Sequence, residues 1–325
     1  MRARLKHTHV GEWPSITLVN DALQLLVIPE LGGKIVSLKS RRTGREWLWS
    51  NPHIPHAKPS HDALNFGMYD SGGWDEIFPT IDPCSVPDTA WGERQLTDHG
   101  ELWYQPWQVD AARITENRSA ELKLVVDDMD LPFRFGRTLT LNGNRGSLRV
   151  HYEVLNRSEL PLPFIWAAHP LFAIEPGDAI ILPPSTIVSS TGNVGLSLAG
   201  DSLPFAWPQL KLATGEVIDV NRIPDHSAGF AIKLFAENVT PPTVEIADHT
   251  RLERLQISFS SPISHCGLWL NYGAWSGAST KNYFNIGVEP TTSPCDSLEM
   301  ACGKKLAVAI QPYSEKRWQL NLSIR

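Results

Sequence analysis

Two ionisable residues, each closing an apolar run and each followed by proline, are the first candidates for chemistry. His169 follows the apolar run 164–168 and precedes Pro170, and Glu289 precedes Pro290 in the same way. Proline has no N–H to donate to a sheet, so both side chains are predicted to lie at strand ends, where functional sites are commonly built. An imidazole and a carboxylate together can exchange protons near neutral pH. The structural alternatives are a hydrogen-bonded core histidine and a surface carboxylate at a strand exit.

A third candidate, His99, lies at the end of a long irregular segment. Residues 51–100 are rich in Pro, Gly, His and Trp and fit neither a strand nor a long helix. A long structured loop in a compact domain usually carries a site or covers one, so we predict a functional loop region there. The segment also contains the acidic pair Asp75 and Glu76, and His99 is predicted to open the strand that follows it.

The elements that must position these residues are short strands, with period-two alternation from one end of the chain to the other. Turn signals separate them, as at 20–21 and 142–146, and helical periodicity is nearly absent. No linker, repeat or low-complexity tract interrupts the pattern. Residues 1–325 are therefore predicted to form a single all-β domain, a large antiparallel β-sandwich with few helices. The predicted strands are 16–19, 23–28, 34–39, 46–49, 102–109, 121–126, 133–141, 147–155, 229–235, 243–246, 255–259, 267–272, 284–288, 305–310 and 318–324.

The composition narrows the classes of partner and the compartment. A formal net charge of -6, with acidic and basic residues mixed throughout, provides no basic stripe for nucleic acid and no polybasic membrane patch, so a small or uncharged partner is expected. No apolar run approaches the ~20 residues of a membrane helix, and no apolar signal-peptide segment follows the basic N-terminus. Four cysteines without a C-x-x-C pair fit free thiols in a reducing compartment, which favours a soluble, cytoplasmic protein. They are Cys84, Cys266, Cys295 and Cys302.

Tryptophan is over-represented, with 12 in 325 residues. Tryptophan side chains that are not needed to fill a core often form flat surfaces for binding ligands, and the C–H-rich faces of sugars commonly pack on them. The structural alternative is a core rich in tryptophan. We expect one or two of the tryptophans near the candidate motifs to stack on a ligand and the others to lie in the core. These tryptophans are Trp74, Trp103, Trp107, Trp166 and Trp269.

Four motifs, taken in order, resemble those of a known family. They are Pro29-Glu30-Leu31-Gly32-Gly33, His99 before a predicted strand, His169, and Gly287-Val288-Glu289-Pro290. In this order and spacing the chain resembles a divergent member of the aldose 1-epimerase, or galactose mutarotase-like, family over nearly its whole length. The resemblance implies a large antiparallel β-sandwich, the fold that the alternation indicates independently.

The resemblance also implies roles for the three ionisable candidates. Glu289 matches the general base of the family, His169 its general acid, and His99 the supporting histidine beside the sugar ring. Opening a cyclic hemiacetal needs one group to take the proton of the anomeric hydroxyl and another to protonate the ring oxygen. No metal, nucleotide or covalent intermediate is required, so neither a metal nor another cofactor is expected. The expected partner is a free aldose or a close derivative, bound by a monomer or homodimer.

The residues that would choose the sugar depart from the better-known members of the family. The loop before the first histidine offers Asp75 and Glu76 where an arginine is usual, and Pro170 follows the second histidine in place of an Asn-rich segment. An acidic pair disfavours an anionic sugar and suits hydroxyl groups. Asp225 is the nearest match to an aspartate that binds sugar hydroxyls in the family, with a turn residue as the alternative. The expected substrate-binding residues are Asp75, Glu76, Asp225, Trp74, Trp166 and Trp269.

Three other functions fit parts of the sequence. A glycoside hydrolase could use two carboxylates among Asp75, Glu76, Glu101 and Glu289, although the best-placed proton donor is an imidazole. A carbohydrate-binding protein without catalysis fits the same fold, but it would need neither an acid nor a base. A zinc site could be built from histidines in the first loop, although their spacing matches no zinc motif. The residues of that loop are His53, His56, His61 and Asp62.

Overall fold

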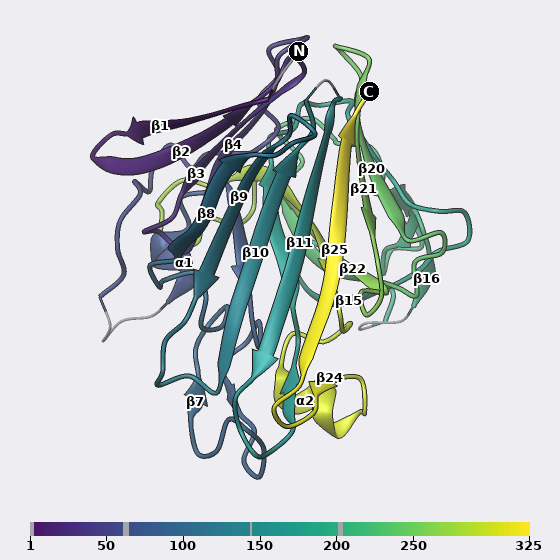
Figure 1. Cartoon of the computed structure of the whole chain (residues 1–325). Coiled ribbons are helices and arrows are strands. Elements are labelled where there is room, and N and C mark those ends of the chain that lie inside the picture. Colours follow the sequence, from purple (N-terminus) through teal and green to yellow (C-terminus); the bar gives the residue numbers. More distant parts are fainter. Residues whose placement is uncertain (1–2, 61–64, 144, 201–203) are drawn as a thin grey trace.

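Two large antiparallel sheets, packed face to face, make up most of the molecule (Figure 1). The computed structural model describes residues 3–60, 65–143, 145–200 and 204–325. Within these residues the larger sheet has eleven strands and the smaller has eight, and the strands within each sheet pair antiparallel. The expected all-β sandwich with few helices is confirmed.

The larger sheet carries the residues of interest at its centre. Its middle strands, β5, β13, β23 and β22, come from three distant parts of the chain. In spatial order it contains β1 (Arg4–Val10), β2 (Trp13–Val19), β3 (Leu23–Ile28), β4 (Lys34–Ser40), β5 (Trp74–Ile77), β13 (Ala167–Phe172), β23 (Phe284–Thr291), β22 (His265–Tyr272), β19 (Phe230–Glu237), β15 (Ile187–Val194) and β16 (Phe205–Ala206).

The smaller sheet lies across the core from the larger one. In spatial order it contains β14 (Ala179–Ile181), β20 (Thr243–Asp248), β21 (Glu253–Phe259), β25 (Glu315–Ile324), β11 (Ser147–Asn156), β10 (Phe133–Leu141), β9 (Ala120–Val126) and β8 (Gln108–Ile114). Three two-stranded sheets pair β6 (Cys84–Ser85) with β7 (Gln95–Leu96), β12 (Leu162–Phe164) with β24 (Val308–Ile310), and β17 (Gln209–Lys211) with β18 (Val217–Asp219).

The two helices found in the described part of the chain are short. They are α1 (Phe66–Tyr69) and α2 (Leu298–Gly303). Ser297 caps α2 by accepting the N–H of Met300 with its side chain. Across the described parts of the chain, no helix has the length and apolar character needed to cross a membrane.

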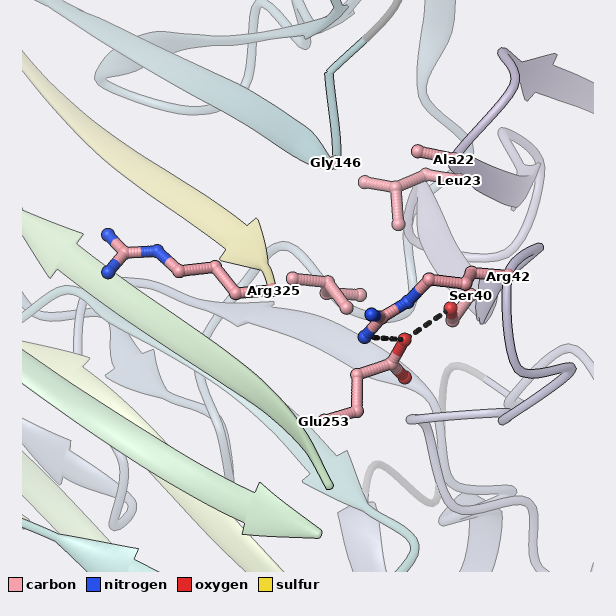
Figure 2. A pocket seen from close by; sticks show the side chains of 8 residues that line it. Ala22, Leu23, Ser40, Arg42, Gly146, Glu253 and Arg325 are labelled. Atoms are coloured by element: carbon pink, nitrogen blue, oxygen red, sulfur yellow. Dashed lines mark hydrogen bonds and ion pairs between the residues drawn. The ribbon is translucent and has the colours of Figure 1, made fainter. Parts of the chain in front are cut away.

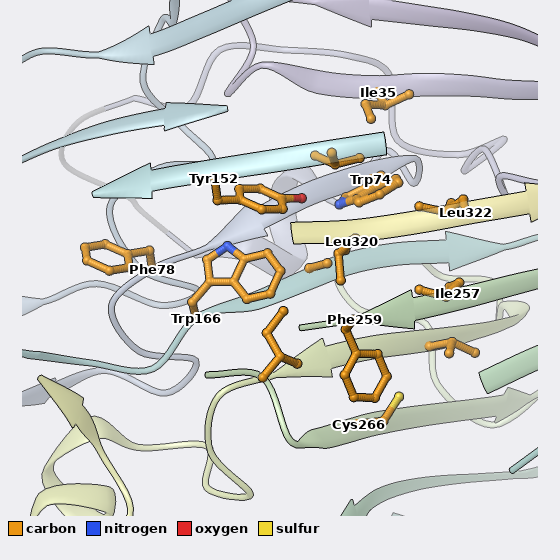
Figure 3. Packing of buried hydrophobic residues seen from close by; sticks show 14 of the residues in the cluster. Ile35, Trp74, Phe78, Tyr152, Trp166, Ile257, Phe259, Cys266, Leu320 and Leu322 are labelled. Carbon is orange, nitrogen blue, oxygen red and sulfur yellow. The ribbon is translucent and has the colours of Figure 1, made fainter. Parts of the chain in front are cut away.

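The hydrophobic core fills the space between the two sheets. Leu320 and Leu322 of β25 and Phe259 of β21 point from the smaller sheet toward Trp74 and Cys266 of the larger one (Figure 3). Alternate residues of a strand point to opposite faces, so each strand of the larger sheet sends one set of side chains into this core and the other set to the outer face. The outer face is therefore available for a site.

The chain departs from the predicted strands in the segment 101–107. A strand was expected there, but the chain turns repeatedly and β8 begins only at Gln108. Two tryptophan side chains donate hydrogen bonds to backbone carbonyl groups close to them in sequence. Trp103 Nε1 donates to Asp98 O at 2.9 Å, and Trp107 Nε1 donates to Leu102 O at 3.1 Å. Such local bonds compete with sheet pairing and favour turns. His99 consequently lies in a tight turn and does not open a strand.

Two further departures concern strands at the N-terminal end. The segment 46–49 makes isolated bridges in place of a continuous strand. In contrast, β1 was not predicted, because its sequence RLKHTHV has no clear apolar face. It pairs with β2 alone and forms an edge of the larger sheet, where polar side chains are tolerated on both faces.

The prediction that His169 and Glu289 lie at strand ends is wrong. Both strands continue past their prolines, since β13 runs to Phe172 and β23 to Thr291. Pro170 remains paired with Trp74 on the β5 side, and Pro290 with Cys266 on the β22 side. Pairing is interrupted only between β13 and β23. Residues 168–170 of β13 have no partner on β23, whereas Ala167 and Leu171 on either side of them do.

Candidate active site

A pocket of about 620 Å³ lies over the middle of the larger sheet, on its outer face. Its floor follows a row of directly opposed residues on neighbouring strands, whose side chains share one face. The row runs Gly192, Lys233, Trp269, Gly287 and Leu171, across β15, β19, β22, β23 and β13. All of these except Gly287 line the pocket. The register of five strands, therefore, positions the floor of the site.

His169 and Glu289 lie next to this row and opposite each other. The pairs Ala167–Thr291 and Leu171–Gly287 fix a register in which His169 faces Glu289 across the unpaired interval. His169 Nε2 is 3.7 Å from Glu289 Oε1, and both side chains line the pocket although they are more than nine-tenths buried. The structure thus brings together the two residues that the sequence predicts as acid and base.

The two oxygens of Glu289 have different surroundings. Oε2 forms an ion pair with Lys233 Nζ, whereas Oε1 is buried and accepts no hydrogen bond from the described residues. Glycines make room for this carboxylate, because a Cβ on Gly287 would lie 2.4 Å from Oε1 and one on Gly267 would lie 2.9 Å from Oε2. One oxygen is therefore held and the other remains without a donor beside His169.

Lys233 is a site residue that the sequence analysis missed. It projects from β19, whose sequence FAIKLFAE is otherwise apolar up to its last residue. Burial alone would lower the pKa of the Lys233 ammonium, but the carboxylates of Glu289 and Asp296 outweigh burial and raise that pKa above its usual value. The cation is therefore retained. A lone lysine inside an apolar strand was the available signal, because such a residue needs a buried counter-charge.

His169 is neutral at neutral pH. Burial, together with the nearby His99 and Lys233, holds the pKa of His169 well below its usual value. Its ring packs edge-on against Phe66 of α1 and against His99, with centroids 5.3 and 5.4 Å apart. These contacts fix the plane of the imidazole.

His99 enters the pocket from the loop region 51–100. Its ring stacks on Phe66, with centroids 4.0 Å apart, and its Nδ1 is 2.7 Å from Asp98 Oδ1. The other oxygen of Asp98 accepts the N–H of Phe66 at 2.8 Å. Burial alone would raise the pKa of Asp98, but the hydrogen bond and charge of His99 bring it below its usual value. Asp98 is thus ionised, and its two oxygens hold the ring of His99 and the backbone of Phe66.

Glu76 does not reach the pocket, contrary to its expected role in binding sugar. It is paired with Ala168, next to His169, and so points to the opposite face, into the core. There its carboxylate accepts hydrogen bonds from Arg137, Tyr152 and Trp166, at 2.9, 2.9 and 3.1 Å. Burial raises the pKa of Glu76 to about 7, and these partners limit the rise.

Asp75, Trp74 and Trp166 also lie away from the pocket. Asp75 faces the same side as His169 but is 2% exposed and forms an ion pair with Lys34 at 2.7 Å. The indoles of Trp74 and Trp166 are buried between the sheets (Figure 3). These buried residues belong to the structure that carries the site and do not line the pocket, contrary to their expected role in binding substrate.

Asp225 and Trp269, the remaining expected binding residues, have contrasting positions. Asp225 is exposed in a turn, where its carbonyl oxygen accepts the N–H of Ala228 at 3.0 Å, and it does not line the pocket. Trp269 lines the pocket next to Lys233. Among the other tryptophans of the motifs, Trp103 and Trp107 are buried.

Acidic side chains from separate loops line the rest of the pocket. They include Asp70, Asp82 and Asp296. Asp82 lies beside Asp296, since its backbone N–H donates to Asp296 O at 2.8 Å. Burial raises the pKa of Asp82, and the carboxylate of Asp296 raises it further. The pocket therefore presents carboxylates that attract hydroxyl donors and repel anionic groups.

The proposals of a zinc site and of a glycosidase pair find no matching group among the described residues. His56 Nδ1 bonds to Ser71 Oγ at 2.9 Å, and burial lowers its pKa to about 4. His61 and Asp62 lie outside the described residues. Among the residues that are described, no three His, Cys, Asp or Glu side chains form a group suited to a metal ion. Of the four carboxylates considered for a glycosidase, only Glu289 lines the pocket.

A smaller cavity of about 220 Å³ lies where the N-terminal strands meet the C-terminus (Figure 2). Its acidic residue, Glu253, is fully buried and accepts hydrogen bonds from Ser40 at 2.6 Å, Arg42 at 3.2 Å and Thr43 at 3.0 Å. Because these donors occupy both oxygens, the carboxylate joins β21 to the turn after β4 and has a structural role.

Solved structures with the same fold are numerous. The Slr1438 protein of Synechocystis is 18% identical, with 100% of this chain and 96% of that chain covered and a TM-score of 0.64. A galactose mutarotase-like protein of Clostridium acetobutylicum is 18% identical, with 100% and 99% covered and a TM-score of 0.67. A galactose mutarotase related enzyme of Lactobacillus acidophilus is 16% identical, with 96% and 97% covered and a TM-score of 0.61. At these identities the likeness shows the fold alone.

The fold and pocket define a galactose mutarotase-like β-sandwich with an imidazole and a carboxylate side by side over its larger sheet. The sequence profile of the aldose 1-epimerase family matches residues 14–205, which is more than half of the chain. This protein belongs to the aldose 1-epimerase family, and the resemblance inferred from its motifs is confirmed.

Proposed function

We propose that this protein is an aldose 1-epimerase, which interconverts the α and β anomers of a free aldose by opening and reclosing the sugar ring. The observation that carries the proposal is the placement of His169 opposite Glu289 in one pocket, with Nε2 and Oε1 3.7 Å apart. Membership of the family and the carboxylates around the pocket, which suit hydroxyl groups, support it.

The proposed mechanism uses only side chains of this chain. Oε1 of Glu289, to which none of the described residues donates, takes the proton of the anomeric hydroxyl while Lys233 holds Oε2. The imidazolium of His169 gives a proton to the ring oxygen, and the C1–O5 bond breaks to leave the open-chain aldehyde. Rotation about C1–C2 and reclosure, with both proton transfers reversed, give the other anomer and restore both groups. His99, supported by Asp98, binds the sugar beside His169.

The depressed pKa of His169 is compatible with its role as acid. At pH 7 only a small fraction of His169 carries the proton, but an imidazolium in a buried site gives its proton up readily. His99 lies beside it, with centroids 5.4 Å apart, and an ionised carboxylate on its own Nδ1 keeps the ring of His99 in place.

Anomer exchange followed by NMR tests the proposal. Freshly dissolved aldoses are followed at neutral pH with the wild type, Glu289→Gln and His169→Asn. We expect accelerated exchange for at least one sugar, with a loss of about 10²–10⁴-fold in each variant. Asp225→Asn is the matched control, because this carboxylate lies in an exposed turn away from the pocket. Sugar-induced chemical shifts without any acceleration would contradict the proposal and indicate a carbohydrate-binding protein.

A further inference from the structure

A half-exposed tryptophan lies at the rim of the pocket. Trp275 is 48% exposed, lies in the connection between β22 and β23, and lines the same pocket as His169 and Glu289. A tryptophan side chain is large and apolar and is highly buried in most proteins. Its exposed face is available to a ligand in the pocket that holds the acid/base pair.

The backbone of Trp275 is fixed before any ligand binds. Asn271 at the end of β22 is fully buried, and its amide contacts Trp275 twice: Oδ1 accepts the N–H of Trp275 at 3.1 Å, and Nδ2 donates to its carbonyl at 3.1 Å. The N–H of Tyr283 donates to the same carbonyl at 2.7 Å. A rigid aromatic side chain on a fixed backbone loses little conformational entropy when it binds a ligand.

A second indole connects Trp275 with the reacting groups. Trp269 lies 6.0 Å from Trp275 between ring centroids, at an interplanar angle of 88°, so the two indoles form a corner. Trp269 is also directly opposite Gly287, over which the carboxylate of Glu289 lies. The aromatic surface therefore extends from Glu289 outward to the solvent-exposed face of Trp275.

We propose that Trp269 and Trp275 form a second subsite, which holds the sugar ring next to the reducing end. The preferred substrate is then a neutral disaccharide or longer oligosaccharide with a free reducing end. This inference rests on the proposed function, which places the reducing ring between His169 and Glu289.

The size and charge of the pocket support an uncharged ligand of more than one ring. Its volume of about 620 Å³ falls within the range of ~300–1,000 Å³ that encloses drug-sized ligands, which are larger than one pyranose. The apolar C–H face of a sugar packs on an indole, while its hydroxyls donate to carboxylates such as Asp82 and Asp296. These carboxylates repel phosphate and carboxylate substituents, which makes a neutral sugar the better fit.

Anomer exchange on matched sugars tests the subsite. D-Glucose is compared with maltose, cellobiose and lactose, which all have glucose at the reducing end. We expect kcat/KM for at least one disaccharide to exceed that for glucose by about five- to tenfold. Trp275→Ala removes this advantage and leaves glucose unchanged within about twofold, whereas Trp275→Phe keeps most of it because an aromatic face remains.

A binding measurement separates the subsite from catalysis. Methyl glucoside and the methyl glycosides of the three disaccharides have no anomeric hydroxyl, so they bind without reacting, and their affinities are measured by NMR titration. Tighter binding of a methyl disaccharide, lost in Trp275→Ala, supports the subsite even if no sugar is epimerised. Accelerated exchange of glucose without any preference for a disaccharide, in either assay, would overturn the subsite and leave the proposed function intact.

Met300→Ala is the control for loss of exposed apolar area. Met300 is 50% exposed on α2 and does not line the pocket, so we expect wild-type values in both assays. Equal losses for glucose and disaccharides in Trp275→Ala and Trp275→Phe would show that Trp275 only supports the loop, and would also overturn the subsite.

Discussion

His169 and Glu289 face each other across β13 and β23 in the interval where these two strands do not pair. Proline follows each of them and cannot donate a backbone hydrogen bond, so the ladder opens beside the two side chains while each strand stays paired on its other side. The distance between the two groups is consequently set by the sheet. A pair held in this way is prepared for proton transfer before substrate binds.

Lys233 is expected to determine which oxygen of Glu289 acts as the base. In Lys233→Met the carboxylate loses its counter-charge and is free to turn, so we expect kcat/KM to fall by about 10²-fold, as for a misplaced reacting group. Lys233→Arg keeps a cation beside Oε2, so we expect it to retain more activity than Lys233→Met. The anomer-exchange assay with both purified variants measures this difference, and wild-type activity in Lys233→Met would contradict this role.

Gly287 is expected to be required for the position of Glu289. A Cβ at this residue would lie 2.4 Å from Glu289 Oε1, so Gly287→Ala displaces the carboxylate and lowers kcat/KM by about 10²-fold. Gly303→Ala is the control, because no atom lies within 4 Å of the Cβ that it adds. The anomer-exchange assay with both purified variants checks the prediction, and wild-type activity in Gly287→Ala would refute it.

The depressed pKa of His169 predicts a pH optimum on the acidic side. In the proposed mechanism the imidazolium is the proton donor, and its population rises as pH falls toward a pKa well below the usual value for histidine. Anomer exchange, corrected for the uncatalysed rate, should therefore increase from pH 8 to pH 6. If the rate is constant over this range, the proton comes from another group, and profiles of His99→Asn and His169→Asn identify which histidine supplies it.

The buried pair of Glu76 and Arg137 predicts a pH-dependent contribution to stability. The folded-state pKa of Glu76 is raised to about 7 from a usual 4.5, so the folded protein binds more protons between these values and loses stability as pH rises through them. Removing the guanidinium raises this pKa further. Arg137→Met should therefore lower the free energy of unfolding by about 3–5 kcal/mol at pH 8, and by less at pH 5, where the carboxyl is protonated.

Denaturant unfolding at both pH values measures this difference. Arg134→Met on the same strand is the control, since Arg134 is partly exposed and pairs with Asp127 at 3.0 Å outside the core. We expect that variant to change the free energy of unfolding by about 1 kcal/mol or less at either pH. An equal loss for Arg137→Met at pH 5 and pH 8 would show that ionisation of Glu76 does not affect stability.

The fold and the central pair could be predicted because both depend on local sequence. Period-two alternation reveals strands wherever one face is buried, and the two prolines mark His169 and Glu289 within apolar runs. The predicted strand over 102–109 was wrong in its first part, because side chains there form hydrogen bonds with the backbone in place of a neighbouring strand. The indoles of Trp103 and Trp107 donate to carbonyl groups of their own segment.

The remainder of the site depends on registers and contacts between distant segments. Asp75 and Glu76 are adjacent, yet the pairing of β5 with β13 turns only one of them toward the core. Lys233 acquires its role because β19, β22 and β23 align it with Glu289. Asp82 and Asp296 meet through a loop contact that no local pattern reveals.

The parts of the site that lie on the eleven-stranded sheet are expected to resist local unfolding better than the parts that lie on loops. β13 is the central strand, sixth from either edge, and β23 is its neighbour, and segments at that depth are the last to open in local unfolding. Trp275, Asp82 and His99, in contrast, come from connections that tolerate insertion and exchange. Loops could thus be exchanged between relatives to change the lining of the pocket while His169 and Glu289 keep their separation on the sheet.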